Sequence, residues 1–225
     1  MQPEHARDLG SAQRRHWQST YTAHPGMYGA EPSAPALYAA ERFRVAGART
    51  VLELGAGHGR DTLHFARQGF TVVATDFSSV ALDQLRAAAV RQSLEQRVLG
   101  LLLDVRDTLP LAAASVDGAF AHMLLSMALS TSEIEAIAAE VRRVLRPGGT
   151  FVYTVRHTGD AHHRIGTPHG DGIWEVGGFA VHFFSRSLVD DLARGWTLEE
   201  VAPFEEGELP RRLWRVTLTR GSGTV

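Results

Sequence analysis

The chain has 225 residues, 44% of them hydrophobic and 21% charged, which is typical of one folded domain and excludes a disordered or fibrous protein. The formal net charge of −2 provides no strong basic field for holding a nucleic acid. The absence of cysteine excludes disulfide frameworks, thiolate metal sites and cysteine nucleophiles.

Residues 1–46 are expected to form a helical cap. Trp17 and Tyr21 lie four residues apart, as on one helix face, and a Pro- and Gly-rich stretch leads from them to an alanine-rich helix over about 36–45. No run is apolar and long enough for a membrane span, and the N-terminus lacks the apolar core of a signal peptide. We therefore expect a cytoplasmic protein with no membrane partner.

Strands and helices alternate through residues 47–155, which we expect to be the ligand-binding core. Helices are expected over about 60–68 and after two capping serines, Ser78 and Ser132, the second in a capping box with Glu135. The expected strands are TVLELG, TVVATD, LGLLLDV, SVDGAFAHML and GTFVYTV. Such alternation favours a mostly parallel sheet with helices on both faces and a ligand at the carboxyl ends of the strands.

Residues 156–225 differ in composition and pattern from the preceding core. The segment 157–178 is rich in Gly and His without a clear period, and we expect it to be an irregular loop or lid on the acceptor side. A short helix near 188–193 and a terminal strand pair, WTLEEVAPFEE and RRLWRVTLTR, are expected to complete a single domain of 225 residues.

Polar residues follow three of the expected strands. Glu53 precedes the glycine turn GAGHG, where bare backbone below a helix N-terminus can touch a ligand. Arg60 stands where the dinucleotide fingerprint has its last glycine, which disfavours a diphosphate. Asp76 can accept both hydroxyls of a ribose, and Asp104 can accept an adenine amine while Val105 contacts the ring.

The motifs ELGAGHG, ATDFS, LLLDV, VDGAF and LRPGG, at these spacings, resemble those of class I S-adenosylmethionine-dependent methyltransferases. The resemblance covers about residues 50–155. It implies a Rossmann-like, doubly wound α/β fold in three layers (α/β/α), whose seven-stranded sheet is mostly parallel with an antiparallel last strand. It also implies S-adenosylmethionine as the cofactor and S-adenosylhomocysteine as its product.

The same resemblance implies roles for individual residues in binding the cofactor. Asp76 takes the ribose hydroxyls, Phe77 flanks the adenine, and Asp104 with Val105 reads the adenine. His122 follows the fourth strand and lies beside both cofactor and acceptor. Gly55 and Gly57 line the methionine portion. The other expected cofactor-binding residues of this turn are Ala56 and Glu53, whose carboxylate can accept from an ammonium group.

More loosely, the short cap is similar to that of small-molecule methyltransferases of the tellurite-resistance and thiopurine type. Together with the charge balance, this favours a small-molecule acceptor, no nucleic acid, and a monomer or homodimer. The expected reaction is an in-line methyl transfer, which requires alignment of the reacting atoms and exclusion of water. Two alternatives remain: a catalytically silent module that binds S-adenosylmethionine or S-adenosylhomocysteine, and an NAD-type oxidoreductase.

Histidines are the candidate groups for base catalysis or positioning of the acceptor. We assign that role to His122 and His157. The alternatives are that His122 is simply a packed side chain and that His157 is a solvated one. No metal site is expected, because the histidine spacing of metal motifs is missing. The acidic residues Glu199, Glu200, Glu205, Glu206 and Glu208 are interpreted as a solvated face. The candidate acceptor-binding residues are Trp17, Tyr21, Tyr28, His157, His162, His169 and His182.

Overall fold

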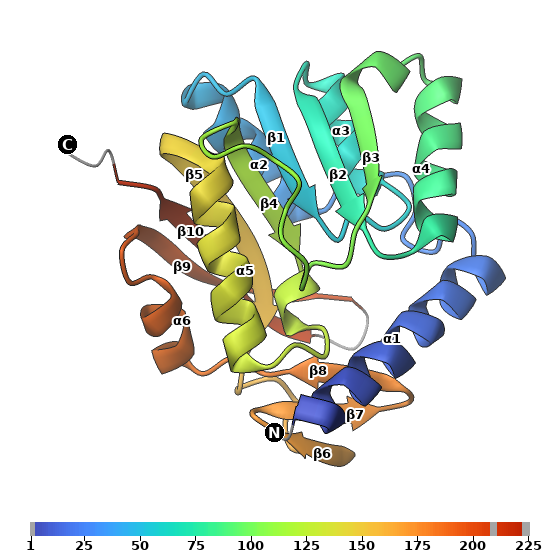
Figure 1. Ribbon diagram of the computed structural model, residues 1–225, viewed down its shortest axis with the longest axis vertical. Coiled ribbons are helices and arrows are strands. Elements are labelled where there is room, and N and C mark those ends of the chain that lie inside the picture. The colour runs from blue at the N-terminus through green and yellow to red at the C-terminus, as the bar shows by residue number, and fades with distance from the viewer. Residues whose placement is uncertain (1–2, 208–210, 222–225) are drawn as a thin grey trace.

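The computed structural model describes residues 3–207 and 211–221, and its centre is a seven-stranded sheet (Figure 1). The strand that comes last in the sequence is sixth in the sheet and runs antiparallel to both of its neighbours. The first five strands of the sheet pair in parallel. In spatial order the strands are β3 (Val98–Leu102), β2 (Thr71–Asp76), β1 (Thr50–Leu54), β4 (Val116–His122), β5 (Leu145–Arg156), β10 (Arg211–Thr219) and β9 (Thr197–Glu206). This sheet confirms the expected Rossmann-like architecture.

Helices cover both faces of the sheet and make the three expected layers. On one face, Phe43, Phe65 and Leu82 are buried in one apolar cluster; on the other, Ile134 and Val189 belong to a second. The first face carries α2 (Ala34–Val45), α3 (Arg60–Arg67) and α4 (Ser79–Arg91), and the second carries α5 (Thr131–Val144) and α6 (Arg186–Leu192). Two short 3-10 turns, η1 (Glu95–Arg97) and η2 (Leu124–Ser126), follow α4 and β4.

Helix α2 belongs to the core and not to a cap, which corrects the interpretation of residues 1–46 as one cap. Phe43 is fully buried and packs on Phe65 with ring centroids 5.9 Å apart. A Cβ atom at Gly118 of β4 would come within 2.7 Å of the Phe43 ring, so the helix lies directly on the sheet. Only α1 (Pro3–Ala23) remains as a covering helix.

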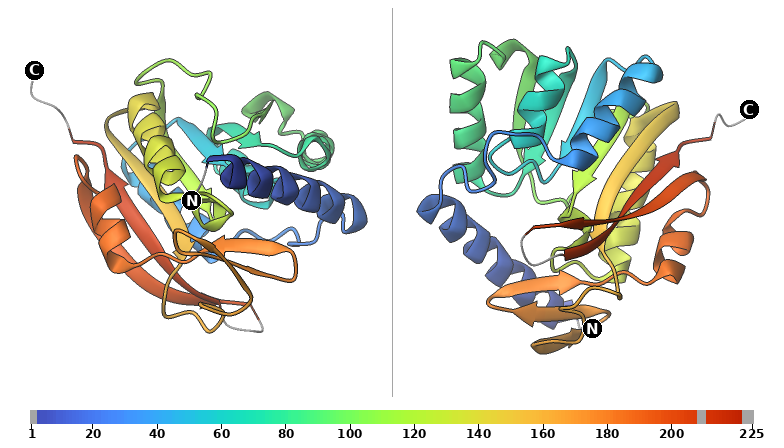
Figure 2. Two further views of the ribbon diagram at one scale, coloured as in Figure 1. Left: turned by 60° about the horizontal axis from the view of Figure 1, so that its bottom comes forward. Right: turned by 180° about the vertical axis from the view of Figure 1, so that it is seen from behind.

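A small antiparallel sheet replaces the irregular loop expected over 157–178. It consists of β6 (Thr167–Gly170), β7 (Ile173–Val176) and β8 (Phe179–His182). The prediction failed because these strands have four residues each, too few to show a period, and are joined by glycines with positive φ such as Gly172 and Gly177. Both α1 and this sheet lie across the carboxyl ends of the parallel strands (Figure 2).

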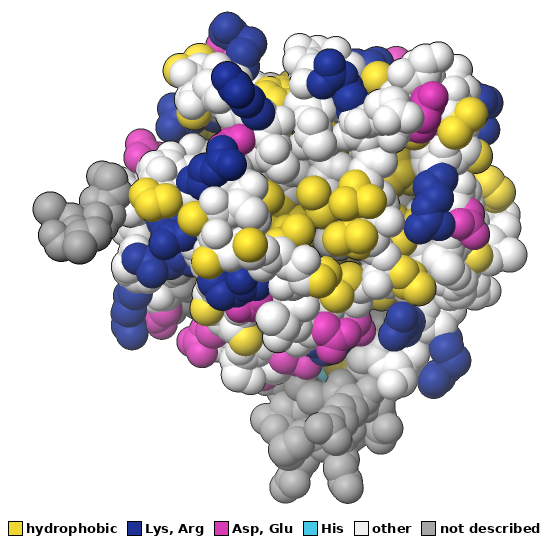
Figure 3. Space-filling model, turned by 45° about the horizontal axis from the view of Figure 1, so that its top comes forward, with side chains coloured by type: hydrophobic (Ala, Val, Ile, Leu, Met, Phe, Trp, Pro, Cys, Tyr) yellow, Lys and Arg dark blue, Asp and Glu magenta, His cyan; other side chains and the backbone are white. Residues whose placement is uncertain are grey.

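The crossover from β3 to β4, residues 103–115, contains no helix in this described part of the chain. As a result, Leu99 of the edge strand β3 stays 52% exposed. Hydrophobic side chains gather in the middle of the face seen in Figure 3, with arginines around them. No helix within the described ranges is long and apolar enough to cross a bilayer.

Candidate functional site

A cavity of about 640 Å³ lies between the carboxyl ends of the parallel strands and the covering α1 and small sheet. Its floor comes from the turns after β1, β2 and β4, where the topology predicts a ligand site. Of the residues expected to bind the cofactor, the cavity is lined by Glu53, Gly55, Ala56, Gly57, Asp76, Phe77 and His122.

The glycine turn after β1 is shaped by its neighbours. Gly57 has a φ of +55°, and a Cβ atom there would come within 2.7 Å of the Tyr21 hydroxyl of α1. Gly59 has a φ of +89° and caps α3, and a Cβ atom would meet Leu85 at 2.2 Å. Larger residues are therefore excluded at both positions by backbone conformation and by space.

Asp76, at the end of β2, is 8% exposed and hydrogen-bonds to the glycine turn after β1. One carboxylate oxygen accepts the N–H of Gly57 and the other that of Ser78, both at 2.8 Å. Burial raises the pKa of Asp76, while these two hydrogen bonds oppose the rise. Each oxygen keeps a second lone pair for a ligand hydroxyl.

Glu53 is buried deeper, at the end of β1. Its Oε2 accepts the hydroxyl hydrogen of Thr62 at the start of α3. Burial and the nearby carboxylate of Asp61 raise the pKa of Glu53 well above its usual value. Asp61 itself accepts both the N–H and the hydroxyl hydrogen of Ser33, at 2.7 and 2.9 Å, and thereby ties the start of α2 to α3.

The structure does not bring Asp104 and Val105 into the cavity. Asp104 is paired with Arg106 of the same loop, whose Nη1 lies 3.1 and 3.2 Å from the two carboxylate oxygens. Arg106 is anchored in turn on Glu133 of α5, at 2.9 Å. In this arrangement both oxygens of Asp104 already have a cationic donor, so the proposed contact with adenine requires Arg106 to share them.

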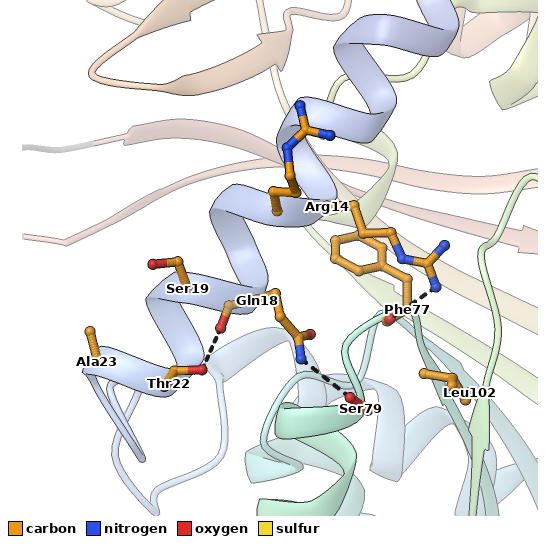
Figure 4. A pocket seen from close by; sticks show the side chains of 9 residues that line it. Arg14, Gln18, Ser19, Thr22, Ala23, Phe77, Ser79 and Leu102 are labelled. Carbon is orange, nitrogen blue, oxygen red and sulfur yellow. Dashed lines mark hydrogen bonds between the residues drawn. The ribbon is translucent and has the colours of Figure 1, made fainter.

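A second hollow, of about 680 Å³, lies on the other side of Phe77, between α1 and the start of α4 (Figure 4). The Arg14 guanidinium lies 5.9 Å from the centre of the Phe77 ring, and its Nη2 points to the Phe77 carbonyl at 3.4 Å. The Gln18 amide donates to the hydroxyl of Ser79 at 3.2 Å. These contacts hold α1 beside the expected adenine position.

Aromatic residues of the covering elements form the roof of the cavity. Trp17 packs against Tyr21 and against Phe179 of β8, with ring centroids 5.7 and 5.3 Å apart. Tyr28 stacks on His58 of the glycine turn at 5.8 Å. All three expected aromatic residues, Trp17, Tyr21 and Tyr28, therefore lie at the cavity. Burial raises the pKa of both tyrosines, which keeps their hydroxyls protonated.

The expected histidines separate into two groups. His122 and His162 line the cavity. His157 stacks on Trp214 of β10 at 4.5 Å, His169 pairs with Glu175 at 2.7 Å, and the buried His182 donates to the carbonyl of Leu129 at 2.7 Å. The structure therefore places these three outside the residues that line the cavity.

The sequence analysis did not predict several residues that line the cavity. Glu206 lines the cavity, which corrects its assignment to a solvated face, while Glu205 beside it is exposed and Glu208 lies outside the described residues. Arg156 at the end of β5 also lines it, held by Asp160 through Nη2 at 2.6 Å and Nε at 3.1 Å. Further unpredicted residues that line the cavity include Met27, Arg60, Met127, Trp174, Phe179, Phe183 and Arg211.

Known proteins are similar to the central part of this chain. Residues 51–149 match a family model described as a methyltransferase domain. An uncharacterized methyltransferase of Mycobacterium tuberculosis is 41% identical over 104 residues, which are 46% of this chain and 38% of that protein. A dimethylglycine N-methyltransferase of Parasynechococcus marenigrum is 34% identical over 109 residues, 46% of this chain and 36% of that protein. The chain thus spans less than two-fifths of the length of these relatives.

Solved structures share the fold over most of the chain. The 1,6-didemethyltoxoflavin-N1-methyltransferase of Burkholderia thailandensis, with its acceptor and S-adenosylhomocysteine bound, has a TM-score of 0.73 at 20% identity. The match covers 96% of this chain and 90% of that one. The CcbJ methyltransferase of Streptomyces caelestis has a TM-score of 0.70 at 23% identity, over 90% and 95% of the two chains. At these identities the similarity establishes the shared fold.

Proposed function

We propose that the chain is a class I methyltransferase that uses S-adenosylmethionine to methylate a small-molecule acceptor. The observation that carries the proposal is the cavity lined by both the glycine turn of β1 and the buried carboxylate of Asp76. The name of the dimethylglycine relative and the bound acceptor of the Burkholderia structure support a small acceptor.

The residues present fit the cofactor. Asp76 offers two buried carboxylate oxygens, each with a free lone pair, for the ribose hydroxyls. Gly55 and Gly57 expose backbone where side chains would fill the space, since a Cβ atom would come within 2.9 Å of Leu124 and 2.7 Å of Tyr21. Phe77 offers an apolar face to the adenine. Bound there, the cofactor supplies an electrophilic methyl group on a sulfonium.

The protein's own part is to enclose and orient the acceptor. Trp17 and Tyr28 cover the cavity from the N-terminal segment, while Phe179 covers it from the small sheet. Their apolar rings exclude water from the space in which the two reactants meet. Because covering elements from two parts of the chain close over this space, it suits a small molecule better than a polymer. Of the two candidate bases, only His122 lines it.

Calorimetric titration with S-adenosylhomocysteine tests the proposal without knowledge of the acceptor. We expect this ligand to bind, and NADH and ATP, used as controls, not to bind. Binding of NADH in its place would overturn the proposal in favour of an oxidoreductase. Once an acceptor is found, turnover distinguishes the enzyme from a silent binding module.

A further inference from the structure

The two oxygens of Glu206 have different surroundings at the end of β9. Oε2 is buried and lies 3.2 Å from Nε2 of His122, without a well-aligned hydrogen bond among the described residues. Oε1 has no hydrogen-bond partner there, and the side chain, 30% exposed, lines the cavity. Oε2 therefore faces the His122 imidazole, whereas Oε1 remains free to accept a hydrogen from a ligand.

The orientation of His122 is fixed from its other side. The N–H of Met123 donates to Thr154 Oγ1 at 2.9 Å, and Thr154 Oγ1 lies 2.8 Å from His122 Nδ1. Among the described residues the Thr154 hydroxyl has no other acceptor for its own hydrogen than Nδ1, so we infer that it donates to Nδ1. Neutral His122 then carries its hydrogen on Nε2, facing Glu206. Nδ1 then accepts from Thr154 and Nε2 faces Oε2, so Oε1 of Glu206 is the acceptor atom that a ligand meets.

Cationic side chains lie near the Glu206 carboxylate. Arg60 Nη2 lies 3.9 Å from Oε1, and Arg211 also lines the cavity. The His122 imidazole, followed by these two arginines, holds the pKa of Glu206 below its usual value, so the carboxylate is ionised at neutral pH. With its charge compensated, Glu206 suits a neutral O–H or N–H donor better than a second cation.

The walls around this carboxylate favour a flat ligand. The Arg60 guanidinium lies 5.6 Å from the centre of the Tyr28 ring, which places this aromatic side chain close to Glu206. The cavity is also lined by Trp17 and Phe179, which pack edge to face, and by Trp174 of the small sheet. Stacking on such rings favours planar molecules.

We infer that Glu206 recognises the acceptor by a hydrogen bond from an O–H or N–H group, and that the acceptor is a neutral aromatic compound bearing that group. This inference rests on the proposed function, because it concerns the acceptor end of the same cavity. In this recognition His122 positions Glu206, and Thr154 positions His122.

A matched pair of probes tests the inference. The complex with S-adenosylhomocysteine is titrated with 2-naphthol and with 2-methylnaphthalene, which has a similar shape and no hydrogen-bond donor. We expect wild type to bind 2-naphthol about tenfold to a hundredfold more tightly, the effect of one hydrogen bond to a charged acceptor. Glu206→Gln should reduce this preference to about threefold or less. Glu206→Met, which removes both oxygens, should abolish it.

Glu205→Gln is the control. Glu205 directly precedes Glu206 in the chain, is 58% exposed and pairs with Arg212 at 3.3 Å. It should keep the full preference for 2-naphthol. A wild type that binds S-adenosylhomocysteine but shows no preference, or a Glu206→Met variant that retains it, would overturn the inference and leave the proposed function intact. Failure of wild type to bind S-adenosylhomocysteine would instead overturn the proposed function.

Discussion

The carboxylate of Asp76 accepts the backbone N–H of Gly57 at 2.8 Å and so joins the end of β2 to the glycine turn after β1. One residue thereby shapes the turn and offers its remaining lone pairs to the cavity. This brings two motifs 19 positions apart to the same cavity.

The first prediction concerns Asp76→Asn. The substitution keeps the shape and one acceptor oxygen but removes the charge, so we expect affinity for S-adenosylhomocysteine to fall about tenfold to a hundredfold, or about 1.5 to 3 kcal/mol. Calorimetric titration measures it. Asp83→Asn is the control, since Asp83 is 71% exposed on α4 and pairs with Arg86. Equal affinity of wild type and Asp76→Asn would refute the role given to Asp76.

The strand-end motifs could be predicted because they depend on local geometry. Gly57 and Asp76 each follow a short buried strand, and parallel strands bring their carboxyl ends to one edge of the sheet. The histidine-rich composition of residues 157–182, in contrast, did not predict which histidines line the cavity. His157 and His182 belong to a His-rich region, but the direction of each side chain depends on contacts with Trp214 and Leu129 that are distant in sequence.

One wrong prediction had a signal in the sequence that could have been used, and another had none. Glu205 and Glu206 are adjacent on a strand, and the two-residue period of a strand places one of them outward and the other inward. The α5 capping box is formed by Ser130 and Glu133, not by Ser132 and Glu135. Both pairs have the same spacing, so the spacing alone could not choose between them.

The second prediction concerns the buried pair of Arg156 and Asp160. Asp160 accepts from the Arg156 guanidinium and from the backbone N–H groups of His162 and Arg212, both at 2.8 Å. Removing its charge leaves the buried guanidinium unpaired, so Asp160→Asn should lower the free energy of unfolding by about 3 to 5 kcal/mol at neutral pH. Denaturant unfolding measures it. Asp190→Asn, at an exposed pair with Arg186, should change it by less than about 1 kcal/mol.

The third prediction gives the pH dependence of that difference. Although burial opposes the shift, hydrogen bonds from Arg156 and from the His162 and Arg212 backbone lower the pKa of Asp160 from 3.8 to about 2. A carboxyl group with a lowered folded pKa stabilises the fold fully above its unfolded pKa and loses this contribution as the pH falls toward the folded pKa. The stability difference between wild type and Asp160→Asn should therefore be constant above about pH 5 and shrink between about pH 4 and 2. A constant difference down to pH 2 would contradict it.

The fourth prediction concerns the attachment of α1 to the small sheet. The buried Gln13 side chain donates to the carbonyl of Gly178 at 2.7 Å and accepts from the N–H of Ala180 at 3.3 Å. Gln13→Ala should loosen α1 and increase amide hydrogen exchange in residues 9–23 about tenfold, as expected for a loss of about 1 to 2 kcal/mol. Ser11→Ala, at an exposed position of the same helix, should exchange like wild type. Unchanged exchange in Gln13→Ala would show that other contacts hold the helix.

The last prediction concerns the hydrogen of His122. Since Thr154 accepts from Met123 and lies 2.8 Å from His122 Nδ1, neutral His122 should carry its hydrogen on Nε2. The imidazole nitrogen-15 shifts, measured at alkaline pH, should show this form in wild type and in Thr154→Ser, which retains the hydroxyl. Thr154→Val removes the donor and should shift the population toward the Nδ1–H form. It also leaves the N–H of Met123 without its acceptor, which should lower the free energy of unfolding by about 1 to 3 kcal/mol. A predominant Nδ1–H form in wild type would mean that Glu206 faces an unprotonated nitrogen, and the arrangement inferred for the acceptor end would then be wrong.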